Sequence, residues 1–183
     1  VNQCERMKVG TCLNPLHTAL AVYGCLLGYV KISDEIRDPQ LKGLIEKIGY
    51  DEGLPVVVNP GVLNPKAFID ELLEQRLPNP NVPDTPQRIA TDTSQKVGVR
   101  YGITIKAYGD KAKDLKYIPL AIAGWCRYLL GINDEGHAFT PSPDPLLEDL
   151  QKTLAGVRFG HPETAAGALH SILSNRSIFG GMD

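Results

Sequence analysis

The sequence repeats one signal for the start of a helix, a polar residue followed directly by proline. The polar side chain accepts hydrogen bonds from the free N–H groups of a first helical turn. Proline suits the first helical position because no N–H is needed there. The repeated signal therefore predicts a fold built from helices. It occurs at Asn14-Pro15, Asp38-Pro39, Asn64-Pro65 and Thr85-Pro86.

The hydrophobic pattern extends this prediction to an all-α fold over residues 1–183, with about seven or eight helices and little or no sheet. Segments 16–29 and 115–130 are apolar nearly all round, which predicts central helices. The stretches 53–64 and 133–145 are rich in proline and glycine and are expected to be loops, and residues 174–183 a loose tail. The other helices are predicted at 33–37, 39–48, 65–77, 86–106 with a bend near Gly98 or Gly102, 146–154 and 162–173.

The composition is that of a soluble globular domain, with 43% hydrophobic and 22% charged residues and a formal net charge of -2. Lysine and arginine are scattered, so no nucleic-acid surface is predicted. The longest apolar run, 16–30, is interrupted by polar residues and is shorter than the ~20 residues of a membrane-spanning helix. The four cysteines show no metal-binding spacing, which predicts neither a zinc site nor a disulfide framework and suits the cytoplasm.

Asn14 and His17 are polar residues at the start of the apolar segment 16–29. They are three residues apart, so a helix places them on one face. His17 falls in the first turn, where the helix dipole disfavours a charged imidazolium. A neutral imidazole there can donate a hydrogen bond to a substrate oxygen. The alternative is structural, with Asn14 acting as the helix cap and His17 as a hydrogen-bonded core histidine.

Three cationic residues are further candidates. Lys8 lies at the edge of the apolar cluster, where a lysine can act as an acid or base, or can simply be a solvated surface residue. Arg88 and Lys96 are eight residues apart on one predicted helix, which leaves them about 80° apart around its axis. Such a pair can hold a carboxylate or several hydroxyl groups. The alternative is a solvated basic face.

The chain resembles the polyol-specific long-chain dehydrogenases, the mannitol dehydrogenase family, and within it the branch that contains fructuronate reductase (D-mannonate oxidoreductase). The similarity covers about three quarters of the chain. It is carried by RMKVGTCLNPLHTALAVYGCLLGY (6–29), DPQLKGLIEKIGYDEG (38–53), RLPNPNVPDTPQRIATDTSQK (76–96) and GDKAKDLKYIPLAIAGWCRYLLG (109–131).

The resemblance implies a fold like the C-terminal domain of 6-phosphogluconate dehydrogenase, and hydride transfer between NAD and a sugar acid or polyol. Lys8 would be the general acid/base, with Asn14 and His17 as catalytic partners, while Arg88 and Lys96 would bind the substrate. No metal is implied. The match departs at one point, because five residues separate Lys8 from Asn14 where the family pattern has four.

The resemblance also implies an N-terminal Rossmann domain in the same polypeptide, which would bind the cofactor. The chain starts at Val1 with charged residues that lead into a core helix. We therefore expect a C-terminal piece of a longer enzyme that is inactive by itself.

Two alternatives remain open at this point, a mannitol or polyol 2-dehydrogenase of the same family and a non-catalytic helical domain for interaction or oligomerisation. The enzyme hypothesis predicts that the five candidate side chains line one concave surface.

Overall fold

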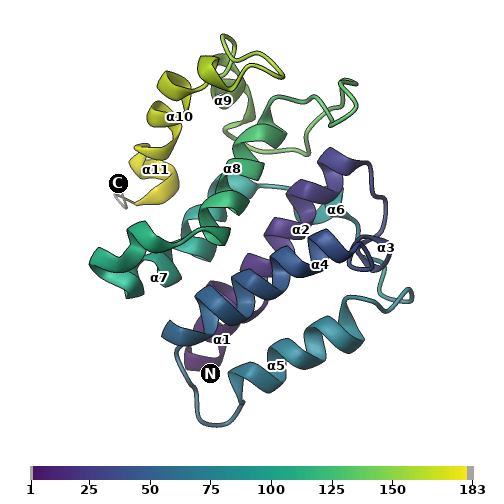
Figure 1. Ribbon diagram of the computed structural model, residues 1–183, viewed down its shortest axis with the longest axis vertical. Coiled ribbons are helices and arrows are strands. Elements are labelled where there is room, and N and C mark those ends of the chain that lie inside the picture. The colour runs from purple at the N-terminus through teal and green to yellow at the C-terminus, as the bar shows by residue number, and fades with distance from the viewer. Residues whose placement is uncertain (1, 181–183) are drawn as a thin grey trace.

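The computed structural model describes residues 2–180 and shows an all-helical fold (Figure 1). The α-helices are α1 (Asn2–Met7), α2 (Asn14–Leu27), α3 (Ile32–Glu35), α4 (Pro39–Glu46), α5 (Pro65–Glu71), α6 (Pro86–Ile89), α7 (Val97–Tyr108), α8 (Tyr117–Leu129), α9 (Leu147–Thr153), α10 (Ala166–Leu173) and α11 (Arg176–Phe179). Three segments are π-helical, Lys8–Cys12, Lys47–Gly53 and Leu72–Arg76, and four are 3₁₀ turns, Leu54–Val56, Thr93–Gln95, Gly109–Asp114 and Pro162–Thr164. The described residues form no sheet, only two isolated β-bridges, so the predicted fold class is confirmed.

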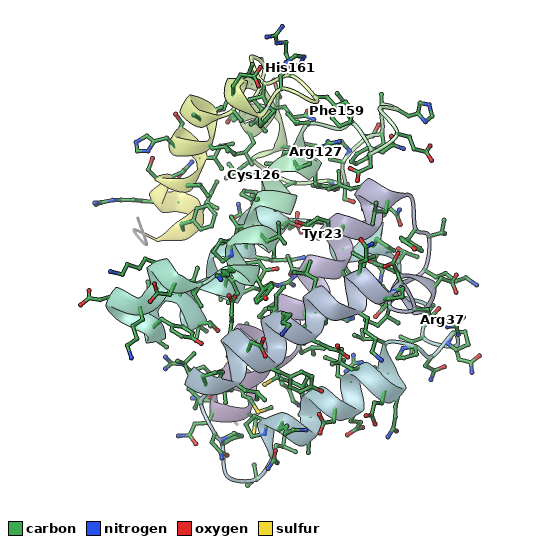
Figure 2. All side chains as sticks on the ribbon, in the orientation of Figure 1. Tyr23, Arg37, Cys126, Arg127, Phe159 and His161 are labelled. Carbon is green, nitrogen blue, oxygen red and sulfur yellow. The ribbon has the colours of Figure 1, made fainter. Side chains whose placement is uncertain are left out.

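The core is organised around α2, which contacts α4, α6, α7 and α8. Its apolar residues are buried on nearly every side, as the sequence predicts. α8 approaches α2 closely because residue 124 is glycine: a Cβ there would lie 2.6 Å from the ring of Tyr23. The Tyr23 hydroxyl donates to the carbonyl of Leu120 on α8 (2.8 Å), and Figure 2 shows its side chain between the two helices. The two predicted central helices thus pack directly on each other.

The signal of a polar residue followed by proline marks a capped helix start, as the sequence predicts, at three of its four positions. Asp38, Asn64 and Thr85 each accept a hydrogen bond from a backbone N–H of the helix that follows. These caps fix where α4, α5 and α6 begin.

Among the described residues, every helix is too short or too polar to span a membrane.

The predicted continuous helix over 86–106 is wrong. α6 ends at Ile89, a 3₁₀ turn follows, and α7 starts only at Val97. Asp92 adopts a left-handed backbone conformation (φ 55°), which breaks the helix. The 141–145 loop holds this break, because the Asp92 N–H donates to the carbonyl of Pro143 (2.9 Å) and the Ser94 N–H donates to the Asp144 carboxylate (2.7 Å).

The prediction of a loose tail over 174–183 is wrong for the residues that can be described. Asn175 caps the short helix α11, whose Ile178 and Phe179 are buried. Phe179 packs edge-on against Trp125 of α8, with ring centroids 6.1 Å apart. Aromatic burial therefore anchors this segment. Residues 181–183 lie outside the described part of the chain.

Candidate active site

Lys8 begins the π-helix Lys8–Cys12, in which the Leu13 N–H bonds back five residues to the Lys8 carbonyl (3.0 Å). On an uninterrupted α-helix, the nine-residue step to His17 would turn about 900° and place the two side chains on opposite faces. The π-turn absorbs one extra residue. Leu13, which follows the π-helix, has a non-helical backbone conformation (φ -127°, ψ -65°), so Lys8 and His17 are not related by rotation about one helix axis. The additional residue between Lys8 and Asn14 falls in the segment that contains the π-helix, whose wider turn takes one residue more than an α-helical turn.

Lys8 and His17 both face the helical segment formed by α5 and its π-helical continuation. The Lys8 ammonium lies over the ring of Phe68, 5.5 Å from its centroid. His17 lines a small cleft with Arg76 and Leu77. Phe68 and Arg76 are eight residues apart, about 12 Å along a helix. Lys8 is therefore on the His17 side of the domain but outside the His17 cleft.

The prediction that Asn14 caps α2 is wrong. The chain enters α2 directly from the π-turn, so Leu13 is the capping residue and Asn14 already lies in the first turn. The Asn14 carbonyl accepts a hydrogen bond from the Thr18 hydroxyl (2.8 Å). Its half-buried side-chain amide forms no hydrogen bond within residues 2–180, which leaves both the donor and the acceptor available to a ligand.

His17 is held as a neutral imidazole. Burial, together with the smaller effects of the nearby charges of Arg76, Arg100 and Arg88, lowers its pKa to about 4. Its Nε2 lies 3.9 Å from a carboxylate oxygen of Asp84, too far for a hydrogen bond. A neutral imidazole can donate to or accept from an uncharged substrate group without a change of charge.

Arg88 is placed beside His17 through a shared carboxylate. Thr85 caps α6 by accepting from the Arg88 N–H (3.2 Å), so the arginine sits in the first turn. Its guanidinium forms an ion pair with Asp84, the residue next to His17. The Arg88 side chain is 63% exposed, which leaves its outer face open to a ligand.

Lys96 is close to Arg88 but not on the same helix, because the break after α6 separates them. The predicted 80° relation around one axis therefore does not apply. The Lys96 ammonium donates to the carbonyl of Thr91 (2.5 Å). Its pKa is lowered by burial and by the neighbouring Arg100, against the opposite effect of Asp92 and other nearby acids.

Two arginines of this cluster are not found by the sequence reasoning, Arg76 and Arg100. Arg76 is exposed at the end of the π-helix that faces His17. Arg100, on α7, is half-buried and donates to the Thr18 hydroxyl (2.6 Å). Arg100 follows Lys96 by four residues, a spacing that could have singled it out as a neighbour on the same face.

The structure links His17 to Arg88 through Asp84 and the Asn14 backbone to Arg100 through Thr18. Lys96 is near enough to Arg88 and Arg100 for their charges to lower its pKa. The structure does not place the candidate side chains all in one cavity, because the His17 cleft is lined by His17, Ile32, Ser33, Arg76, Leu77, Val82 and Asp84. Within residues 2–180, no group of three or more His, Cys, Asp or Glu side chains is arranged to hold a metal ion.

The sequence was compared with known protein families. Residues 1–183 match the family described as the mannitol dehydrogenase C-terminal domain. The chain belongs to this family.

Relatives of this mannitol dehydrogenase domain include D-mannonate oxidoreductase from Thermotoga maritima, 58% identical over 98% of the chain and 34% of the relative. The Escherichia coli D-mannonate oxidoreductase is 30% identical over 81% of the chain and 30% of that protein. A solved structure of Pseudomonas fluorescens mannitol 2-dehydrogenase, a ternary complex with NAD and D-mannitol, superposes with a TM-score of 0.82 at 25% identity. The superposed region includes 100% of this chain and 35% of the mannitol 2-dehydrogenase chain. The chain thus spans about a third of the length of the relatives it matches.

Proposed function

We propose that this domain supplies the substrate-binding and catalytic residues of an NAD-dependent oxidoreductase that interconverts a keto-sugar acid and a sugar acid, fructuronate and mannonate. The geometry that supports it best is the pairing of a neutral His17 with an Asn14 amide that has no partner among the described residues. A polar donor left free at a rigid helix start is suited to hold a reacting oxygen. The 58% identity to the D-mannonate oxidoreductase of Thermotoga maritima favours the sugar acid over mannitol.

In this proposal Lys8 transfers the proton. It protonates the oxygen during reduction and accepts the proton during oxidation. For this its ammonium has to leave the ring of Phe68, which the flexible four-carbon stem of lysine allows. Asn14 donates a hydrogen bond to the developing alkoxide, and His17 bonds the same oxygen or a neighbouring hydroxyl.

Arg88 and Lys96 hold the remainder of the substrate. Arg88 offers a planar fork that suits a carboxylate or two hydroxyl groups. Lys96 offers a charge at the junction of the 3₁₀ turn and α7. Their contribution is orientation, because a substrate fixed at its far end presents its carbinol carbon in one position.

The fold of the described residues lacks the features that proteins use to bind a dinucleotide such as NAD. The described residues contain no sheet and no glycine-rich strand–turn–helix unit, so they do not form a dinucleotide-binding cradle. The NAD would be held by another domain of the polypeptide, with the site in the cleft between the two. When bound, its nicotinamide gives or takes the hydride at the substrate carbon.

The test is an activity screen of the full-length protein with fructuronate, tagaturonate, fructose and mannitol, alongside Lys8→Ala. We expect fructuronate to be reduced fastest, and Lys8→Ala to lower kcat/KM by about 10²–10⁴-fold because the proton donor is lost. The 183-residue chain alone should show no turnover.

Lys152→Ala is the control, because Lys152 is exposed on α9 and pairs only with neighbouring acids of its own helix. Its activity should equal that of the wild type. A Lys8→Ala enzyme that keeps more than a tenth of the wild-type kcat/KM would rule out the acid/base role of Lys8. Faster turnover of mannitol and fructose than of the sugar acids would favour the polyol dehydrogenase.

A further inference from the structure

The cations around His17 differ in how their charge is balanced. Arg88 is paired with Asp84. Lys96 donates to a backbone carbonyl and has Asp92 and Asp144 near it, both of which act to raise its pKa. The charge of each of these side chains is thus at least partly compensated within the domain.

Arg100 has no such compensation. A guanidinium has five N–H donors, and the only side-chain hydrogen bond of Arg100 within residues 2–180 is the one to the Thr18 hydroxyl. No carboxylate of these residues lies within 4 Å of it. The side chain is half-buried, and burial lowers its pKa. A partly desolvated cation without an anion is costly, and a bound anion would offset that cost.

The position of Arg100 relates it directly to the proposed reacting groups. Its guanidinium contacts Thr18 at 2.6 Å, and the Thr18 hydroxyl in turn donates to the carbonyl of Asn14 at 2.8 Å. Thr18 directly follows His17 in the first turns of α2. Arg100 is therefore linked through one hydroxyl group to the backbone of Asn14, in the same helical turn that carries His17.

From this geometry we infer that Arg100 is the receptor for the carboxylate of the substrate and determines the preference for a sugar acid over a neutral sugar. The free N–H groups of its fork match the two oxygens of a carboxylate. Arg88 then contacts hydroxyl groups, because its own charge is already paired with Asp84. This inference rests on the proposed function, since it names the residue that selects the substrate class.

The experiment measures kcat/KM for fructuronate and for fructose, in which a hydroxymethyl group replaces the carboxylate, with the full-length wild type, Arg100→Leu and Arg100→Lys. We expect Arg100→Leu to lower the fructuronate/fructose ratio about 100-fold, because a charged hydrogen-bonded pair is lost. Arg100→Lys keeps the charge but loses the fork, so its ratio should fall about 10-fold. The control is Arg158→Leu, which should keep the wild-type ratio, since Arg158 is exposed beside the labelled Phe159 at the far end of the domain (Figure 2).

A second measurement does not depend on turnover. Thermal unfolding of the same full-length proteins is followed with mannonate or with mannitol added. Mannonate should raise the Tm of the wild type more than mannitol does, and this difference should disappear in Arg100→Leu. Equal losses of kcat/KM for both substrates, or equal stabilisation of wild type and Arg100→Leu by mannonate, would overturn the inference. If the wild type turns over neither substrate but still binds mannonate through Arg100, the proposed function fails and the carboxylate site stands.

Discussion

His17 shows how neighbouring groups set the properties of a single residue in this domain. The helix start alone favours a neutral imidazole. The structure adds burial, together with three arginine charges, and these lower its pKa to about 4. The residue is consequently a neutral hydrogen-bonding group across the physiological pH range, as the position in the first turn predicts.

This pKa predicts an acid-dependent loss of stability. The folded-state pKa is below the ordinary 6.5, so between pH 6.5 and 4 the unfolded chain binds a proton that folded His17 does not. Stability is therefore lost as the pH falls through this window, by about 2 kcal/mol at pH 5. Urea unfolding of the wild type and His17→Gln at pH 7 and pH 5 measures it. The wild type should lose more stability than the variant, whereas parallel losses would show that His17 titrates normally.

Glu35 predicts the opposite dependence. Its carboxyl group is fully buried on α3 beside Gly24, and neither oxygen has a hydrogen-bond partner within the described residues. Burial, with a smaller effect of Asp38, raises its pKa to about 9. The contribution of this group to stability is present below the unfolded value of about 4.5 and is lost as the pH rises to about 9.

Glu35→Gln keeps the shape and stays uncharged, so it is the test of this assignment. Between pH 5 and pH 8 the wild type should lose stability relative to Glu35→Gln by on the order of 4 kcal/mol, measured by urea unfolding. A constant difference between the two proteins would mean that Glu35 is ionised in the folded domain at pH 8.

At the scale of elements, the start of α8 and the break between α6 and α7 both depend on residues that are remote in the sequence. The first turn of α8 has no side-chain cap of its own. The buried carboxylate of Glu52 caps it instead, accepting from the N–H groups of Lys116 (2.6 Å), Tyr117 (2.9 Å) and Ile118 (2.7 Å). The break between α6 and α7 is likewise held by the 141–145 loop. Neither feature has a local signal that a reading of the sequence could use.

Gly98 on α7 provides a prediction at this scale. A Cβ at residue 98 would overlap the carbonyl oxygen of Ile178, so glycine is needed for α11 to pack on α7. Gly98→Ala should lower the free energy of unfolding by about 2 kcal/mol through overpacking and make the C-terminal helix more sensitive to limited proteolysis. Gly43→Ala is the matched control, because a Cβ in α4 would meet no atom within 4 Å. It should be neutral or stabilising by about 0.5–1 kcal/mol. Equal stability of the two variants would contradict the packing role of Gly98.

At the scale of the whole molecule, one core joins segments from both ends of the chain. Met7 and Leu16 near the N-terminus belong to the same buried cluster as Trp125 and Phe179. The candidate site lies at the edge of this core, on the first turns of α2, where rigid packing meets exposed cations. Its polar groups are thus supported by buried helices, and the exposed side chain of Arg88 marks the side that is open to solvent.

The sequence by itself determined the helical class, the starts of α4, α5 and α6, and the central position of α2 and α8. These follow from local capping chemistry and from hydrophobic periodicity, which act over a few residues. Residue chemistry and the family resemblance also named the candidates Lys8, Asn14, His17, Arg88 and Lys96. Only the tertiary structure decided that Asn14 is not a cap, that α6 and α7 are separate and that Arg100 joins the cluster. These depend on a π-turn, a loop more than 40 residues away and a contact between α7 and α2. Such contacts form between segments that are distant along the chain, and no local pattern encodes them.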